Sequence, residues 1–461
     1  MLLKFFYDKS LAQASYMVGC QTCGEALIVD PMREIAPYLE AAAAENLRIT
    51  HVAETHIHAD FVSGSRELAA ATDARLYLSA EGGPDWQYAF AGGNTRLLRD
   101  GDHFEVGQVR FDALHTPGHT PEHLMFVLTD TAGADQPMGL FSGDCLFVGD
   151  VGRPDLLETA AGVTGAAEQG ARQQYANLQR LKTMPDYLQV WPGHGAGSAC
   201  GKALGAVPSS TLGYEKLFNP AFQFDDEDAF VAWLLDDQPE TPNYFGQMKQ
   251  VNKHGPALLR SLTRPAQLEG FILHEELKNG ALVIDTRPLQ DFRAAHVPGT
   301  LNIALSDKFS TYAGDFVDYG KPTYLIAEPE LVDHIVKELR AIGVDDIPGF
   351  FPPREMGKLL VTLEAISAKA LAKKLDAVYL LDVRGQSEWR EGHIPGAHHR
   401  PLGQVAAHLA ELPRDQRIVV QCGTGLRSQI VASLLQKVGF TRVSNLDGGI
   451  DAWKDAGLPL E

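Results

Sequence analysis

The sequence has no long apolar run, no basic start and no cleavage-site pattern of the kinds that mark membrane and exported proteins. None of its apolar runs approaches the roughly 18 to 20 residues that cross a bilayer as a helix. The first residues, MLLKFFYDKSLAQ, lack the basic start, long apolar core and cleavage site of a secretory signal. We therefore expect this stretch to form a strand, and we expect a cytoplasmic protein without a membrane partner.

Basic residues and cysteines are also scarce. The formal net charge is -19 and the sequence contains no basic block, which argues against nucleic acid or an anionic membrane as a partner. The five cysteines are too few and too scattered for a disulfide framework, so we expect reduced thiols, some of them reactive. At 461 residues, the chain is long enough for about three domains.

From residue 1 to about 245, short β-rich runs end in turns that carry histidine or aspartate. ITHVAETH ends at His56, RFDALHTPGH at His119, MGLFSGD at Asp144 and YLQVWPGH at His194. Helical segments intervene, among them SGSRELAAATD and AAEQGARQQYANLQRLKTM. Because these side chains sit where strands stop, one edge of a sheet could gather them into a site for Zn, Fe or Mn.

The stretch THIHADF comes close to H-x-H-x-D-H, a pattern that binds two metal ions side by side. His58 and Asp60 are in place, but position 61 is Phe, whose ring offers no lone pair. Three of the four ligands that a second ion would need still remain, including Asp60, His194 and a bridging Asp144. The pattern thus favours one metal ion and disfavours a second.

In this order and at these separations, THIHAD, TPGHT, SGD and WPGHG resemble the metallo-β-lactamase superfamily, and within it the persulfide dioxygenase branch. The resemblance covers about half of the chain. It implies an αββα sandwich and oxidation of a thiol persulfide by O2 at a single ferrous ion, one Fe(II) per chain. It assigns His56, His119 and Asp144 as iron ligands. His58 would be a neighbour of the ligands or an alternative ligand, and Asp60 and His194 would lie beside them.

The same resemblance suggests two substrate-binding residues. Arg153, in DVGRPD, matches an arginine near the carboxylates of the bound thiol, although a surface ion pair is the alternative. Cys200, in SACGKALG, matches a cysteine that takes part in persulfide handling, and a buried inert thiol is the alternative. Cys20 and Cys23 form a C-x-x-C in an expected hairpin turn, without the second cysteine pair of a zinc knuckle, and we favour a non-redox role.

The second half of the chain contains an internal repeat. Residues 281–303 match 378–400, each with a buried strand ending in Asp-x-Arg and a later His-apolar-Pro-Gly. The matched pairs, each 97 residues apart, are Asp285 and Asp382, Arg287 and Arg384, and His296 and His393. Alternating strands and helices predict two α/β domains with mainly parallel sheets covered on both faces. A Pro- and Asn-rich segment before the repeat suggests domain boundaries that divide the chain into 1–250, 251–362 and 363–461.

The stretch RIVVQCGTGLRSQIVASLL predicts a cysteine held in a cradle of backbone N–H groups. A buried strand is followed by Cys422, a glycine-rich loop and a helix from about Ser428, whose N-terminus adds partial positive charge. With Arg427 close by, the thiol should ionise readily and its persulfide should be stabilised as an anion. The residues of this predicted site are Cys422, Gly423, Thr424, Gly425, Leu426, Arg427 and Ser428.

Residues 365–461 resemble rhodanese, a sulfurtransferase, through LLDVR, GHIPGA, CGTGLRS and LDGGIDAW. The Cys-x4-Arg spacing favours sulfur, because phosphatase relatives use Cys-x5-Arg. The first copy has PTYLIAEPEL at the equivalent place, with Ile326 or Ala327 near the cysteine position and no glycine-rich loop. We expect this copy to be an inactive scaffold, with a ligand-binding role as the alternative.

Together these resemblances imply a fused persulfide dioxygenase and sulfurtransferase. Its partners would be a low-molecular-weight thiol persulfide, O2, and sulfite or thiosulfate. The competing interpretation is a zinc-dependent thioester hydrolase of the glyoxalase II type with an appended sulfur carrier. A third has the rhodanese copies acting only as interaction modules. The identity of the thiol, the net direction of sulfur transfer and any homo-oligomer stay open.

Overall fold

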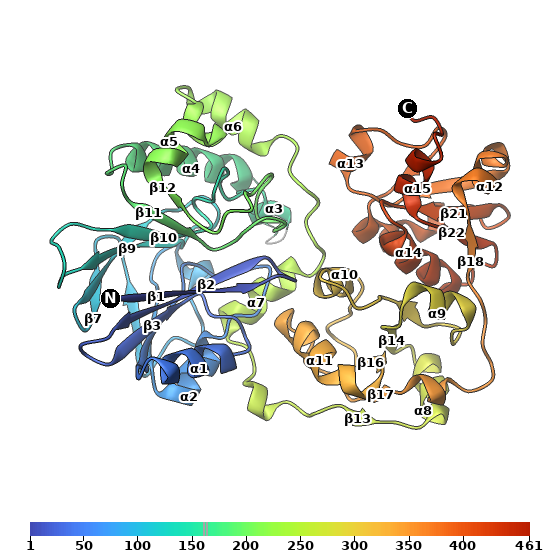
Figure 1. Ribbon diagram of the computed structural model, residues 1–461, viewed down its shortest axis with the longest axis horizontal. Coiled ribbons are helices and arrows are strands. Elements are labelled where there is room, and N and C mark those ends of the chain that lie inside the picture. Colours follow the sequence, from blue (N-terminus) through green and yellow to red (C-terminus); the bar gives the residue numbers. More distant parts are fainter. Residues whose placement is uncertain (160–161, 163–164) are drawn as a thin grey trace. The chain divides into compact units, whose positions relative to one another are not determined.

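The computed structural model describes residues 1–159, 162 and 165–461, and the chain divides into two compact units (Figure 1). The first unit is Met1–Ser261 with Ala341–Gly343, and the second is Leu262–Arg340 with Val344–Glu461. Of the helices described, none combines the length and the apolar character that a bilayer crossing requires.

The first unit contains two six-stranded sheets. In spatial order, the first sheet consists of β1 (Leu2–Asp8), β2 (Gln13–Cys20), β3 (Glu25–Val29), β4 (Arg48–Ala53), β5 (Arg75–Ser79) and β6 (Thr95–Leu98). The second consists of β12 (Ser210–Thr211), β11 (Gln189–Pro192), β10 (Gly139–Gly143), β9 (Leu124–Asp130), β8 (Val109–His115) and β7 (His103–Val106). The expected first strand is therefore confirmed as β1.

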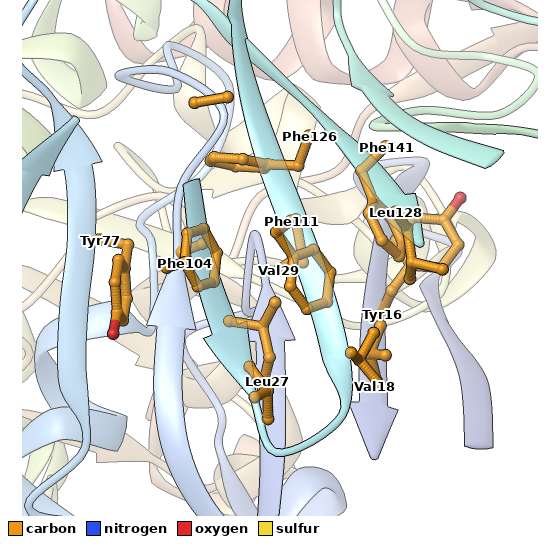
Figure 2. Packing of buried hydrophobic residues seen from close by; sticks show 14 of the residues in the cluster. Tyr16, Val18, Leu27, Val29, Tyr77, Phe104, Phe111, Phe126, Leu128 and Phe141 are labelled. Carbon is orange, nitrogen blue, oxygen red and sulfur yellow. The ribbon is translucent and has the colours of Figure 1, made fainter. Parts of the chain in front are cut away.

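An aromatic core lies between these two sheets (Figure 2). Tyr16 of β2 packs against Phe141 of β10 with ring centroids 5.2 Å apart, and Phe104 stacks on Phe111 at 5.1 Å. Alternate residues of β2 point to opposite faces, so Tyr16 belongs to this inner core and Met17 to the cluster on the outer face. The burial of large rings from both sheets makes the sandwich a rigid support for the loops at its edge.

Helices cover the two outer faces of the sandwich. On the first sheet, α1 (Ala36–Ala44) and α2 (Ser65–Thr72) contribute Tyr38 and Leu68 to the outer cluster. On the second sheet, α4 (Ala166–Lys182), α5 (Leu212–Phe218) and α6 (Glu227–Leu235) contribute Leu178, Leu212 and Phe230. The short α3 (Leu156–Thr159) precedes α4, and α7 (Phe245–His254) ends the helices of this unit. The predicted αββα sandwich is confirmed.

The second unit contains two five-stranded sheets in which every pairing is parallel. In spatial order, one has β13 (Ala266–Gln267), β17 (Gly349–Phe351), β16 (Thr323–Ile326), β14 (Leu282–Asp285) and β15 (Leu301–Asn302). The other has β18 (Glu364–Ile366), β22 (Val443–Leu446), β21 (Arg417–Gln421), β19 (Val378–Asp382) and β20 (His398–His399). The strand order is the same in both, which confirms the internal repeat and the parallel sheets.

The helices of the second unit also follow the repeat. Those of the first copy are α8 (Gly270–Lys278), α9 (Leu289–Ala294), α10 (Phe309–Gly314) and α11 (Val332–Ala341). Those of the second copy are α12 (Ala368–Ala372), α13 (Gln386–Arg390), α14 (Leu426–Lys437) and α15 (Gly449–Asp455). Leu371 of α12 and Trp453 of α15 share a buried cluster with Leu380 and Val419 of the sheet.

The motif residues of the two copies make the same contacts. Arg287 and Arg384 each donate to the carboxylate two residues earlier, with Nη2 to Oδ2 distances of 2.7 Å in both copies. His296 stacks on an aromatic ring at 3.8 Å and His393 does so at 3.6 Å. These side chains therefore stabilise the fold of each copy and are absent from the candidate sites. The predicted domain boundary at 250 falls inside α7, and the three-segment division stays a prediction.

Candidate metal centre and thiol site

The predicted metal ligands meet in the first unit, where several strands end. His56 follows β4, His119 follows β8, Asp144 follows β10 directly and His194 follows β11. Ligand atoms of His56, His119 and Asp144 all lie within 4.8 Å of one another, and all three residues are buried. The Nε2 atoms of His56 and His119 are 3.8 and 3.4 Å from Asp144 Oδ2. The geometry thus brings together two imidazoles and one carboxylate, as expected.

The protonation states of this group suit metal binding. Burial, together with the neighbouring histidines, lowers the pKa of His56 well below its ordinary value, and burial also lowers the pKa of His119. Burial opposes ionisation of Asp144, but His194 and His119 hold the pKa of this carboxyl below its ordinary value. Neutral imidazoles and an ionised carboxylate are the forms that coordinate a metal ion.

The carboxylate of Asp144 lies beside three imidazoles but has no hydrogen-bond donor among the described residues. Both of its oxygens are buried and neither accepts a hydrogen bond from the part of the chain that the structure describes. A buried carboxylate without a partner is costly, and a bound cation would satisfy it. The donor set therefore fits a metal ion held by His56, His119 and Asp144.

Second contacts orient the histidines. The Nδ1 atom of His119 lies 3.0 Å from the carbonyl oxygen of Arg153, and Nδ1 of His194 lies 3.1 Å from that of Ala12. A carbonyl can only accept, so each Nδ1 carries the proton and each Nε2 keeps its lone pair for a metal. The main chain around Arg153 is thereby part of the support of the site.

The side chain of Arg153 is engaged within the protein. Its Nε donates to Asp155 Oδ1 at 2.8 Å and its Nη2 to Oδ2 at 2.5 Å, while Nη1 donates to the carbonyl oxygens of Ala199 and Pro239 at 3.1 and 2.6 Å. The guanidinium is almost fully buried. Arg153 therefore forms an ion pair with Asp155, as the alternative interpretation expected, but the pair is largely buried and not on the surface. Contact of Arg153 with a substrate carboxylate stays a prediction.

His123 is a supporting residue that the sequence interpretation missed. Its Nε2 accepts a hydrogen bond from the backbone N–H of Asp144 at 3.0 Å, and its Nδ1 lies 2.8 Å from Thr116 Oγ1. Burial lowers the pKa of His123 to about 3, so the ring is neutral and able to accept. The available signal was its spacing, four residues after His119 in HTPEH.

His58 faces a carboxylate outside the ligand group. Its Nε2 lies 3.2 Å from Asp30 Oδ1. Burial opposes protonation, but Asp30 and Glu54 raise the pKa of His58 to about 9. Of the two roles that the motif left open, this geometry favours a charged neighbour of the ligands.

A second group of donor atoms lies next to the first. Asp60, His194 and Cys200 offer ligand atoms within 4.8 Å of one another, and His194 Nε2 lies 3.2 Å from Asp60 Oδ2 and 3.4 Å from Asp144 Oδ2. Burial and the carboxylates of Asp60 and Asp144 raise the pKa of Cys200 well above its ordinary value. The ring of Phe61 packs 4.3 Å from that of His58. Cys200 thus lies beside Asp60 and His194, the second donor group, in which Phe61 replaces the histidine of the two-metal pattern.

A cavity of about 370 Å³ reaches His194. Its lining is mainly apolar and includes Phe5, Tyr7, Val207 and Pro208. Apolar clefts with a few polar groups at their base are typical of small-molecule sites. The cavity is therefore the candidate entrance for a substrate.

The cysteine cradle forms in the second unit as predicted. Cys422 follows β21, and its Sγ accepts hydrogen bonds from the N–H of Gly425 at 3.2 Å and from Ser428 Oγ at 3.3 Å. The helix begins at Leu426, two residues before the expected start, because Gly425 adopts a φ of 98° and caps it. A positive φ of this kind favours glycine and turns the N–H toward the sulfur.

Arg427 is oriented by a carboxylate of α13. Its Nη1 and Nη2 donate to the two oxygens of Glu388 at 2.6 and 2.7 Å. Its guanidinium also lies over Gly423, where a Cβ would be 3.4 Å from Nη2. The two hydrogen bonds to Glu388 thereby hold the guanidinium beside the loop.

The first copy has no thiol at the equivalent position. Asp285 pairs with Ile326 in the same register in which Asp382 pairs with Gln421, so the residue that corresponds to Cys422 is Ala327. An alanine side chain offers no nucleophile, and the inactivity of this copy stays a prediction.

The first copy nevertheless contacts the region of the Cys422 loop through Arg293 of α9. Its Nε donates to Gln429 Oε1 at 2.8 Å and its Nη1 to Asp447 Oδ1 at 2.7 Å. The same Gln429 oxygen accepts from Asn445 Nδ2 at 2.9 Å, which also donates to the carbonyl oxygen of Gly425 at 2.9 Å. Arg293 therefore supports the Cys422 loop through Gln429 and Asn445. No local sequence motif indicates this contact.

Family models match two parts of the chain. The metallo-beta-lactamase superfamily model matches residues 10–194, and the rhodanese-like domain model matches residues 365–456. Among solved structures, a metallo-beta-lactamase from Staphylococcus aureus subsp. aureus COL is 43% identical. It aligns with 77% of this chain and 99% of that chain, with a TM-score of 0.69.

Curated relatives include hydrolases, a persulfide dioxygenase and a sulfurtransferase. The hydroxyacylglutathione hydrolase of Rhodospirillum rubrum is 30% identical over 39% of this chain and 60% of its own length. Persulfide dioxygenase ETHE1 of Bos taurus is 26% identical over 42% of this chain and 68% of its own. A sulfurtransferase of Allochromatium vinosum is 36% identical over 21% of this chain and 92% of its own. The chain spans only 54 to 61% of the length of the curated hydrolase-type relatives.

We predict that His123→Phe weakens metal binding. The phenyl ring fills similar space but cannot accept from the N–H of Asp144, so the ligand loses its support. Loss of such a supporting contact lowers metal affinity about 10- to 100-fold. Competition with a chelator measures the affinity, and circular dichroism checks the fold. The control is His103→Phe on β7, an exposed site; equal affinities in both variants would contradict a supporting role.

Proposed function

Because the chain belongs to the metallo-β-lactamase superfamily and carries a rhodanese-like domain, we propose that it is a persulfide dioxygenase joined to a sulfurtransferase. The observation that carries this proposal is the presence, in one chain, of the His56, His119 and Asp144 group and the Cys422 cradle. Similarity to a persulfide dioxygenase and to a sulfurtransferase supports it. All five cysteines are free, which suits a reducing cytoplasm.

The metal of the first site is proposed to be one Fe(II) per chain. Two histidines and one carboxylate, with further positions open, are typical of non-haem Fe(II) oxygenases. When bound, the ion would supply the redox chemistry by which O2 oxidises sulfur. The chain itself keeps the ligands neutral or anionic as required, fixes them through Arg153 and His123, and surrounds them with buried side chains.

The first reaction oxidises the outer sulfur of a persulfide. RSSH, O2 and H2O give RSH, sulfite and two protons, so four electrons pass from that sulfur to O2 and its bond to the inner sulfur breaks. The apolar cavity beside His194 is the proposed route for the substrate.

The second reaction transfers sulfur through Cys422. Its thiolate attacks the outer sulfur of RSSH, the S–S bond breaks, and RSH leaves with the proton. The Gly425 N–H and the Ser428 hydroxyl, which donate to Cys422 Sγ, would stabilise the persulfide on Cys422 through hydrogen bonds. Arg427 would stabilise its negative charge. Sulfite then attacks the outer sulfur, forming thiosulfate and restoring the thiolate.

Joined in this order, the two reactions consume the sulfite that the first one forms. Each step of sulfur transfer is a thiol–disulfide type exchange and is reversible, so thiosulfate can also load Cys422. The fusion thus gives both halves one class of substrate, the sulfane sulfur of a small thiol. The persulfide, O2, sulfite and thiosulfate are the proposed partners.

The second candidate function is hydrolysis of a thioester at a two-metal centre. It is favoured by the proximity of Asp60, His194 and Cys200, which could hold a second ion, and by the similarity to hydroxyacylglutathione hydrolases.

Metal analysis of freshly purified protein separates the two candidates. About one iron per chain, unchanged in Cys200→Ser, is expected for the dioxygenase because Cys200 would not be a ligand. Two zinc ions per chain, falling to one in Cys200→Ser, would identify the hydrolase.

Two substitutions should separate the proposed activities. His119→Ala removes a metal ligand, so it should abolish iron binding and persulfide-dependent O2 uptake while sparing sulfur transfer from thiosulfate to cyanide. Cys422→Ser should do the reverse, leaving O2 uptake and sulfite release but no thiosulfate. An oxygen electrode and thiosulfate analysis measure both, and each variant is the control for the other. Loss of both activities in either variant would contradict two independent sites.

Arg293 should matter for sulfur transfer although it lies in the inactive copy. Arg293→Met keeps the aliphatic stem but loses the hydrogen bonds to Gln429 and Asp447, so the loop loses its brace. Small displacements of reacting groups cost up to about 100-fold in rate, and we expect kcat for transfer from thiosulfate to cyanide to fall about tenfold.

The control is Arg264→Met, which removes an exposed ion pair with Asp333 on the same copy. It should leave transfer unchanged, since exposed pairs contribute little. Equal rates in the two variants, with equal melting temperatures, would show that Arg293 does not position the loop.

A further inference from the structure

The C-x-x-C of the first unit places its two free thiols close together. Cys20 is the last residue of β2, and the turn is closed by hydrogen bonds from the N–H groups of Cys23 and Gly24 to the carbonyl oxygen of Cys20, at 3.2 and 2.9 Å. A Cβ built at Gly107, in the turn between β7 and β8, would lie 2.5 Å from Cys23 Sγ and 2.6 Å from Cys20 Sγ. Both sulfurs therefore converge on one point above this glycine.

The two thiols differ in exposure and in electrostatic surroundings. Cys20 is buried, with 4% of its surface exposed, whereas Cys23 is exposed. The N–H of Gln108 donates to Cys20 Sγ at 3.4 Å. Burial alone would raise the pKa of Cys20, but the N–H groups of Gln108, Cys23 and Thr22 and the Cys23 thiol lower it. The contact with Cys20 raises the pKa of Cys23.

This pair is remote from the metal centre. The first residue of β2, Gln13, bridges to His194, while Cys20 stands at the other end of the strand. At the rise of an extended strand this places the thiols about 23 Å away. Two sulfurs are also too few for a structural metal site, and neither candidate ligand group among residues 1–159, 162 and 165–461 includes them.

The sequence alone favoured a non-redox role, but this geometry leads to another conclusion: we propose that Cys20 and Cys23 form a redox-active dithiol that is converted to a disulfide by low-molecular-weight disulfides. The turn holds the second thiol beside the first, so a mixed disulfide is resolved within the chain faster than by an external thiol. The proposal does not depend on the activity of the metal centre or of Cys422.

The exchange balances with the small disulfide RSSR as the oxidant. The exposed Cys23 thiolate attacks RSSR, the S–S bond breaks, and RS⁻ leaves and takes up the proton that Cys23 released. The Cys20 thiolate then attacks Cys23 Sγ and expels the second RS⁻, which takes up the proton of Cys20. Two electrons pass from the dithiol to RSSR, giving one protein disulfide and two RSH.

The asymmetry of the pair also favours the reverse reaction. A small thiolate can reach only the exposed Cys23, and Cys20 then leaves as a thiolate that keeps its hydrogen bond from the Gln108 N–H. A well-stabilised leaving thiolate speeds reduction. The disulfide is therefore a reversible one, unlike the structural disulfides of secreted proteins.

The test is to equilibrate the full chain with oxidised and reduced glutathione, block free thiols, and analyse the tryptic peptide of residues 10–33 by mass spectrometry. This peptide contains both cysteines and no other. The wild-type peptide should lose two hydrogens, carry no glutathione, and regain them as the reduced form increases. The fully buried Cys145 should stay reduced in the same sample, as an internal control.

Two variants give the matched controls. Cys20→Ser should keep glutathione on Cys23, because no thiol remains to resolve it. Cys23→Ser should stay unmodified, because Cys20 is shielded. Stable glutathione on Cys23 of the wild-type chain, or a peptide that stays fully reduced at excess oxidised glutathione, would overturn the proposal, and both outcomes are read from the wild type alone.

Discussion

The carboxylate of Asp144 is the point on which the first site depends. It is fully buried, and neither oxygen accepts a hydrogen bond from the described part of the chain. An isolated buried anion is strongly unfavourable, so its surroundings must supply positive charge. The sandwich ends several strands at one edge, where the neutral His56 and His119, together with His194, place their Nε2 atoms 3.4 to 3.8 Å from Asp144 Oδ2, so a cation bound among these atoms would supply the charge. Metal binding follows from this arrangement more directly than from any single motif.

Much of this could be read from the sequence. Histidine and aspartate at strand ends predicted the ligand group, and the glycine-rich loop after Cys422 predicted the cradle, because both patterns report local backbone geometry. The repeated Asp-x-Arg predicted two copies of one fold, and the structure confirms it through equal strand order.

What the sequence did not reveal depends on contacts between distant segments. The support of Asp144 by His123 and the approach of Cys200 to Asp60 arise only when separate strand ends meet. The burial of the Arg153 guanidinium against Asp155 and two carbonyls depends in the same way on segments up to 86 residues away. Apart from the H-x3-H spacing of His119 and His123, such contacts follow no sequence period, so composition and motif arguments cannot find them.

The first copy of the repeat illustrates how a domain without the thiol can still support the other copy. Ala327 has no nucleophile, yet the Asp285–Arg287 pair still stabilises the fold, and Arg293 reaches the loop of the other copy. A helical arginine that fixes Gln429 also fixes, through Asn445, the carbonyl of Gly425 whose N–H contacts Cys422. A copy without the thiol is thus compatible with a contribution to the Cys422 loop of the other copy.

The most direct measurement of the central claim is the stoichiometry of the iron-loaded chain supplied with a small thiol persulfide in a closed oxygen electrode. If the two reactions are joined as proposed, one molecule of O2 disappears for each thiosulfate formed and for each two persulfides consumed, with little free sulfite. Thiosulfate formed without O2 uptake, or no O2 uptake at all with any thiol persulfide, would contradict the account.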